Sequence, residues 1–79
     1  MSGVTSEVYV EYDGTPDKAI DNRVADLAQP IAVESGHGLG IRSLWLQFDN
    51  REAADLAATQ LLKVKELNRI SVKYLAEGN

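Results

Sequence analysis

Few residues of this chain are of the types that perform chemistry, and they lack the partners that chemistry needs. His37 is the single histidine, and it lies between two glycines. A catalytic histidine needs a group that orients its ring, and a metal ion needs several ligands. Asp49, Glu52 and Asp55 could suggest a carboxylate site, but helix capping and a charged first helical turn explain them. Cysteine is absent, which excludes thiolate chemistry. We therefore predict that the chain is not an enzyme and has no metal site or cofactor.

Two other patterns point to phosphate binding, and neither has the required context. The glycine-rich segment 36–40 is similar to a phosphate-binding loop, but such a loop opens a helix, whereas a strand pattern follows here. Asn22 and Arg23 are the residue types with which acylphosphatases hold a phosphate. Here they fall inside an expected helix instead of a glycine-rich loop, so we reject that activity.

Alternation of apolar and polar residues predicts strands at residues 7–12, 41–48 and 70–75, and the short segment 31–35 is a candidate for a fourth strand. Residues 31–35 could instead be the end of the preceding helix, in which case three strands remain. Ser35–Gly40 is expected to be a loop, because three of its residues are glycines.

Two helices are expected between these strands. The first has Thr15 as its N-cap and Pro16 at its first position, and Pro30 ends it. The second begins at a capping box that runs from Asp49 to Glu52. Apolar residues that should face the core follow at helical spacing: Ile20, Val24, Leu27 and Ala28 in the first helix, and Ala53, Leu56, Ala57, Leu61 and Val64 in the second.

This order of elements predicts an α+β fold, the ferredoxin-like βαββαβ sandwich. Right-handed crossovers place the strands in the order 4-1-3-2, as a four-stranded antiparallel sheet with two helices on one face. The 79 residues form a single domain, with an ordered core of about 7–76 and a tail at Ala76–Asn79. A domain of this size buries only about 60–65% of its unfolded surface, so self-association or a partner is expected.

Helices on one side leave the other face of the sheet uncovered. The core face is expected to hold Val8, Val10, Tyr12, Leu44, Leu46, Phe48, Ile70 and Val72. The uncovered face is expected to hold Glu7, Tyr9, Glu11, Ser43, Trp45, Gln47, Ser71, Lys73 and Leu75. Tyr9 and Trp45 then lie on the two central strands, where they and Lys73 form an aromatic platform. Large aromatic side chains on an exposed sheet indicate a binding surface.

Several short segments resemble RNA-recognition-motif (RRM) domains. Val8–Val10 resembles the first motif of that family, with an aromatic residue between two aliphatic ones. Trp45–Phe48 is similar to the end of the second motif, Ala54 and Ala57 to the start of its second helix, and Arg69–Val72 to its last strand. The resemblance implies that the aromatic residues of strands one and three stack on RNA bases.

The sequence also departs from the RRM pattern in ways that disfavour RNA. Ser43 replaces a motif aromatic residue, and Glu7 and Glu11 flank Tyr9. Only Lys73 and Arg42 are expected to neutralise phosphates near the platform. The uncovered face is then better suited to a protein partner or to a homodimer, since Tyr and Trp are common interface anchors.

Charge is distributed unevenly along the chain. The net charge is −4, and the acids are concentrated in the first half. An acidic cluster is expected to hold Glu11, Asp13, Asp17, Asp21 and Asp26, and basic residues gather later, at Lys63, Lys65, Arg69 and Lys73. The acids form either an ordinary solvated helix surface or a patch that docks on a basic partner.

The sequence therefore favours a non-enzymatic acidic protein-interaction module. It could be a small inhibitor that docks on a basic nucleic-acid-binding surface of a partner protein, and its size and charge are similar to those of phage-encoded anti-CRISPR inhibitors. Two alternatives stay open: RRM-like binding of single-stranded RNA through Tyr9 and Trp45, and an ACT-like small-molecule regulatory domain with Gly14 in its ligand loop. No apolar run could span a membrane and Met1–Ser6 is polar, so we expect a cytoplasmic protein.

Overall fold

The elements follow one another as the sequence predicts. A computed structural model describes residues 3–75, so the expected tail at Ala76–Asn79 lies outside the described residues. In chain order the elements are β1 (Ser6–Asp13), α1 (Lys18–Ala28), β2 (Ala32–Gly38), β3 (Ile41–Phe48), α2 (Arg51–Leu61) and β4 (Arg69–Tyr74). All strand pairs are antiparallel, in the order β2-β3-β1-β4.

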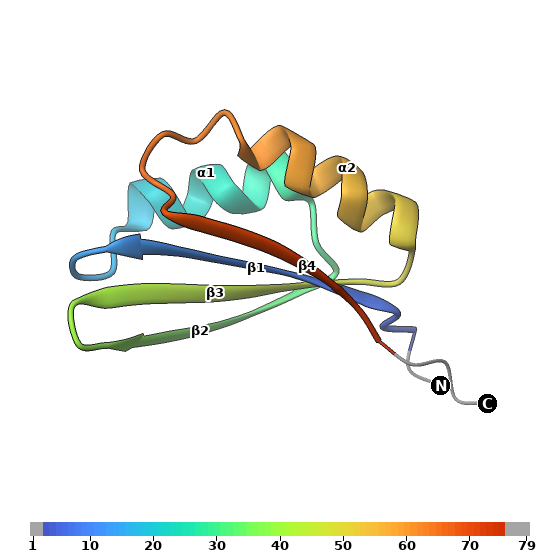
Figure 1. Cartoon of the computed structure of the whole chain (residues 1–79), viewed down its shortest axis with the longest axis horizontal. Coiled ribbons are helices and arrows are strands. Elements are labelled where there is room, and N and C mark those ends of the chain that lie inside the picture. Colours follow the sequence, from blue (N-terminus) through green and yellow to red (C-terminus); the bar gives the residue numbers. More distant parts are fainter. Residues whose placement is uncertain (1–2, 76–79) are drawn as a thin grey trace.

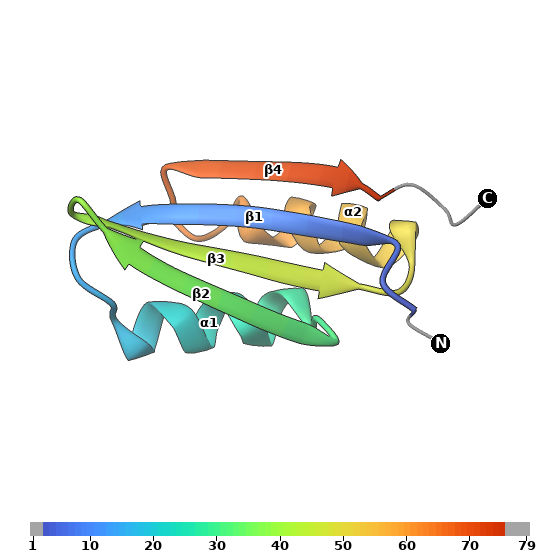
Figure 2. The ribbon, with the colours of Figure 1, turned by 90° about the horizontal axis from the view of Figure 1, so that it is seen from below.

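This arrangement is the expected ferredoxin-like α+β sandwich. The two helices lie side by side over one face of the sheet (Figure 1). Seen from below, no helix of residues 3–75 covers the other face, which presents the strands of the sheet (Figure 2); we call it the open face. Within residues 3–75, neither helix has the length and apolar character needed to cross a bilayer.

The core lies between the helices and the sheet, and most of the expected residues are in it. Its buried members are Val8, Val10, Val24, Ala28, Leu44, Leu46, Phe48, Ala54, Ala57, Leu61 and Val64. Val72 lies on the expected face of the sheet, opposite Val8, but it is 37% exposed because β4 is an edge strand. The expectation that Leu56 faces the core was wrong, because Leu56 is 61% exposed. Leu56 lies about 200° around the helix from Ala54, and α2 turns its small alanines to the sheet.

The expected loop at Ser35–Gly40 is mostly a strand. β2 runs to Gly38, and only Leu39 and Gly40 form the turn into β3. Both turn residues have positive φ, 54° and 76°, which matches the primed turns that fit the twist of a hairpin. The ladder to β3 reaches Gly38, opposite Ile41. Hydrogen bonding to β3, whose sequence strongly favours a strand, thus overrides the low strand propensity of glycine.

Both helices begin one or two residues later than predicted. The first is capped by Asp17 instead of Thr15, because the Asp17 carboxylate accepts a hydrogen bond from the backbone N–H of Ala19 at 2.9 Å. The second is capped by Asn50 instead of Asp49, and the Asn50 side chain accepts from Ala53 N–H at 3.1 Å. These bonds satisfy donors that the first helical turn leaves unpaired.

A polar network fixes the start of α1 to the sheet. The buried Tyr12 hydroxyl donates to Asp21 Oδ1 at 2.7 Å and accepts from Asp17 N–H at 2.8 Å. Arg42 Nη2 donates to Asp21 Oδ2 at 2.8 Å, which raises the pKa of the guanidinium. Asp21 therefore joins β1, β3 and α1, and it is a structural residue.

Replacing Tyr12 with Phe should therefore destabilise the fold. The change removes the hydroxyl and leaves the Asp21 carboxylate and Asp17 N–H short of a partner, which should lower the free energy of unfolding by about 1–3 kcal/mol. Urea unfolding followed by circular dichroism measures this. A Tyr74→Phe variant is the control, because Tyr74 is 48% exposed. Equal stability of the Tyr12 variant and the parent would contradict the structural role of the network.

The same network predicts a loss of stability at alkaline pH. Burial, then the hydrogen bond to Asp21, raises the pKa of Tyr12 above its ordinary value of 10.0. The folded chain then holds this proton more tightly than the unfolded chain. The resulting stabilisation is complete below about pH 10 and declines as the pH rises above it. Stability measured from pH 8 to 11 should fall more steeply for the parent than for Tyr12→Phe, and parallel curves would refute the assignment.

Candidate interaction surface

The centre of the open face is an aromatic pair. Tyr9 on β1 lies directly opposite Trp45 on β3, with ring centroids 5.3 Å apart and planes tilted by 48°. Both side chains are partly exposed, as expected for the middle of a sheet face that no helix covers. Such tilted aromatic pairs add about 0.5–1.5 kcal/mol beyond their buried area, so the two rings support each other.

The Tyr9 ring is also held at its hydroxyl. This group donates to Glu11 Oε1 at 2.6 Å and shares a hydrogen bond of 2.9 Å with Ser43 Oγ. The bond to Glu11 is the main reason why the pKa of Tyr9 is raised. A binding partner therefore meets a ring that is already positioned, so less side-chain entropy is lost on binding.

Trp45 leans from β3 towards the edge strand β2 and lies over Gly36. A Cβ atom added to Gly36 would come within 3.3 Å of Trp45 Cζ3. Gly36 is also the only partly buried residue of β2. An aromatic ring over a strand glycine is a known way of stabilising such a position. Sequence reasoning missed Gly36 because it placed this residue in a loop.

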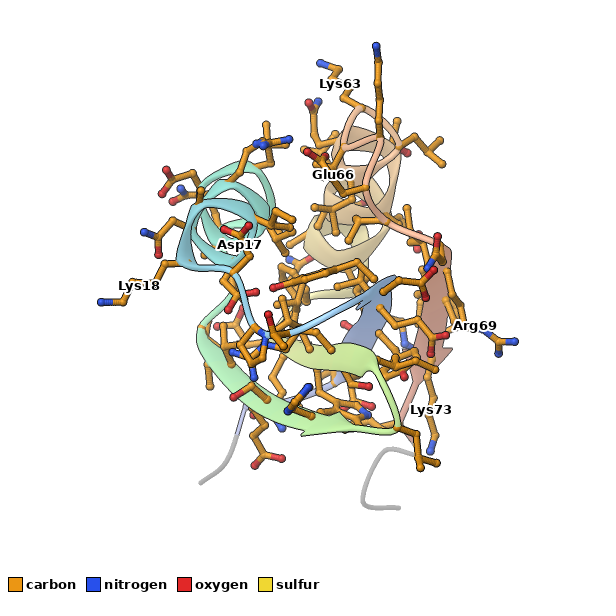
Figure 3. The ribbon with its side chains drawn as sticks, turned by 90° about the vertical axis from the view of Figure 1, so that its left-hand side faces the viewer. Asp17, Lys18, Lys63, Glu66, Arg69 and Lys73 are labelled. Atoms are coloured by element: carbon orange, nitrogen blue, oxygen red, sulfur yellow. The ribbon has the colours of Figure 1, made fainter. Side chains whose placement is uncertain are left out.

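Charges on the open face follow the strand order. Four acids point to this face from β1 and β2, namely Glu7, Glu11, Asp13 and Glu34, as their register with β3 shows. Two cations, Arg69 and Lys73, share the face with them. Both project from β4 at one side of the sheet, away from the helices (Figure 3). The face is therefore acidic across β2 and β1 and basic along β4.

The predicted acidic cluster does not form one surface. Glu11 and Asp13 belong to the open face, whereas Asp21 contacts Tyr12 on the opposite side of the sheet. Asp17 caps α1, and Asp26 is exposed further along the same helix. The cluster was inferred from closeness along the chain, but β1 directs Glu11 and Asp13 to the open face, whereas Asp17, Asp21 and Asp26 belong to α1 on the other side of the sheet.

The predicted basic residues divide in the same way. Lys63 lies with the helices, as Figure 3 shows, and Lys65 follows it in the segment after α2. Arg69 and Lys73 are on the open face. Arg42 lies on the helix side, opposite Tyr12 and bound to Asp21. The expectation that Arg42 could meet phosphates at the aromatic platform was therefore wrong.

The residues considered for catalysis are not assembled. His37 is exposed and pairs with Arg42 across the edge of the sheet. Arg23 binds Glu66 at 2.9 Å in an exposed ion pair. Among residues 3–75, no three or more His, Asp or Glu side chains gather where they could hold a metal ion. A shallow hollow at the start of α2 is lined by Thr5, Asp49, Asn50, Arg51 and Glu52, and its two carboxylates would oppose an anion.

Comparison with known proteins gives this chain no relative. It matches no protein-family model, no curated protein and no solved structure. The resemblance of β1 and β3 to RRM motifs therefore stays a prediction. What the open face binds has to be inferred from its own residues.

The position of Trp45 can be tested at Gly36. In a Gly36→Ala variant the new methyl group forces the indole ring to move by a few tenths of an ångström, since the ring is only 3.3 Å away. We expect altered near-ultraviolet circular dichroism and Trp45 emission, with a stability loss below about 1 kcal/mol. Gly38→Ala is the matched control, because nothing lies within 4 Å of a Cβ at that glycine. Identical spectra for both variants would contradict the placement of Trp45 over Gly36.

Proposed function

We propose that this chain is a non-enzymatic protein-interaction module that docks its open face on a basic surface of a partner. The preformed Tyr9–Trp45 pair carries the proposal. It occupies the centre of the sheet face that no helix of residues 3–75 covers, and its ring centroids lie 5.3 Å apart. Tyr and Trp dominate the anchors of protein interfaces, because they bury much area for little loss of entropy.

The charges around the pair set the chemistry of the partner. Glu7 and Glu11 flank Tyr9 along β1, and Glu34 lies directly opposite Trp45 on β2. Complementary cations on a partner would steer the encounter and fix its orientation. A surface rich in Lys and Arg that normally holds nucleic acid fits this description. By occupying it, the chain would act as an inhibitor, and its similarity in size and charge to anti-CRISPR proteins agrees with this role.

Binding of single-stranded RNA is the second candidate. The adjacent aromatic rings on the central strands favour it, and so do Arg69 and Lys73 on the neighbouring strand. The acids weigh against it, because a phosphate backbone crossing the pair would meet carboxylates on β1 and β2. Trp45 also directs part of its ring at Gly36, which leaves less of it for base stacking.

A small-molecule regulatory role has less support. The ACT-like alternative places the ligand beside the loop after β1, at Gly14. The hollow described above borders Thr5 and Asp49, which lie at the opposite end of β1. Gly14 itself has φ of 106°, so a turn alone accounts for glycine there.

Trp45 emission separates the protein and RNA hypotheses, because it is the single tryptophan. A short arginine-rich peptide should change the emission saturably and bind more weakly at high salt. Glu7→Gln and Glu34→Gln should each weaken peptide binding by about two- to fivefold, as expected for a partly exposed charge pair. Short mixed-sequence single-stranded RNA should cause no change.

Asp26→Asn is the matched control, since it removes one acid from the exposed surface of α1. It should leave peptide binding unaltered. Saturable quenching by RNA, weakened by salt and absent with the peptide, would replace the protein-binding proposal with the RNA hypothesis. Peptide binding that Asp26→Asn reduces as much as Glu34→Gln would mean attraction by net charge and no docking on the open face.

A further inference from the structure

We infer that a second copy of this chain fits the open face, so that two molecules pack sheet against sheet about a two-fold axis parallel to the strands. This inference rests on the proposed function, since it treats the open face as a protein-binding surface, and it names one partner. The reason is that the charged groups and the aromatic pair of this face are arranged so that each meets a complementary group on a second copy.

The registers give the layout of the face. Across its middle, the residues from β2 to β4 are Glu34, Trp45, Tyr9 and Ser71. On β4 the next open-face residues on either side of Ser71 are Arg69 and Lys73. The edge strand β2 therefore has one carboxylate, Glu34, at the level of Ser71. The edge strand β4 has a cation two residues before Ser71 and another two residues after it.

A two-fold axis along the strands brings these groups together. It places β4 of one copy over β2 of the other and β1 over β3. Ser71 then faces the second copy's Glu34, and the carboxylate lies between Arg69 and Lys73. In the centre, each Tyr9 packs on the second copy's Trp45. The interface repeats both contacts, because an isologous dimer uses the same patch on each molecule.

The charges exclude the other in-plane axis. A two-fold axis across the strands would lay β4 on β4 and set Arg69 against the second copy's Lys73. Like charges in such positions oppose association. With the axis along the strands, the acids of β1 face only uncharged residues of β3: Glu7 meets Gln47, and Glu11 meets Ser43.

Both cations are available for this contact. Neither Arg69 nor Lys73 takes part in an ion pair within residues 3–75, and both are exposed. Glu11 and Glu7 lie opposite them on β1, but Glu11 already accepts the Tyr9 hydroxyl at 2.6 Å. Stacked sheets lie about 10 Å apart, a separation that Lys, Arg and Glu side chains span together.

The size of the face sets the strength of the dimer. Four strands spaced by about 4.8 Å and roughly eight residues long cover about 500 Å² of sheet. Standard interfaces bury about 800 Å² on each partner. We therefore expect a weak dimer that forms as the concentration rises and leaves the open face free when the protein is dilute.

Sedimentation velocity of the full chain from about 10 μM to about 1 mM tests the inference in this range of weak affinities. We expect a shift from monomer to dimer, with a blue shift of Trp45 emission as the ring is buried. Glu34→Lys should weaken dimerisation at least tenfold, and so should the double variant Arg69→Glu/Lys73→Glu, because each sets like charges against each other. Asp26→Lys, with the same charge change as Glu34→Lys but on α1, should leave it unaltered.

Mixing the two weakened variants gives the decisive result. In a mixed dimer, the lysine introduced at position 34 of one variant lies between the two glutamates introduced into the other. The native Glu34 of the second variant lies between the native Arg69 and Lys73 of the first. Both contacts are then between opposite charges, so an equimolar mixture should dimerise at least as well as the parent. A parent that stays monomeric at all concentrations would overturn the inference, and so would a dimer that neither variant weakens or a mixture that fails to pair.

These outcomes are separable from those of the proposed function. A chain that binds the arginine-rich peptide through the open face but never self-associates would keep the interaction role and remove only the second copy as a partner. A chain whose Trp45 responds to RNA and not to the peptide would remove the protein-binding role itself.

Discussion

The register of β1 against β3 is the constraint on which the rest of the structure depends. It sets Val8 opposite Leu46 on the helix side and Tyr9 opposite Trp45 on the open side. A slip by one residue would turn every apolar side chain of one strand to solvent. The buried core resists that slip, so the energy that folds the domain also positions the aromatic pair. The open-face aromatic pair and the core residues therefore belong to opposite faces of the same β1–β3 strand pair.

Sequence reasoning recovers this ladder because both strands alternate strictly and both are central. It recovers only the first part of β2, because Gly36 and Gly38 have little strand propensity and only pairing with β3 keeps the second part extended. The helix caps were misplaced because Thr15 and Asp49 satisfy the same rules as Asp17 and Asn50. Which of two suitable neighbours caps a helix depends on the direction from which the chain enters it.

The candidate site was predictable in part for the same reason. Alternation placed Tyr9, Trp45 and Lys73 on the open face, but it could not show that Trp45 covers Gly36. The acidic cluster was inferred from closeness along the chain, but consecutive elements of the chain lie on opposite sides of the sheet. Asp21 illustrates this, because it lies in α1 and its carboxylate binds Tyr12 and Arg42 on the helix side.

The division of charge across the open face has a consequence before any contact is made. Acids on β1 and β2 with cations along β4 give the sheet an electric dipole that runs across its strands. A charged molecule that approaches within about 10 Å, the screening length in 0.1 M salt, experiences a torque as well as an attraction. The open face therefore selects the orientation of an approaching molecule while the two are still separated by water.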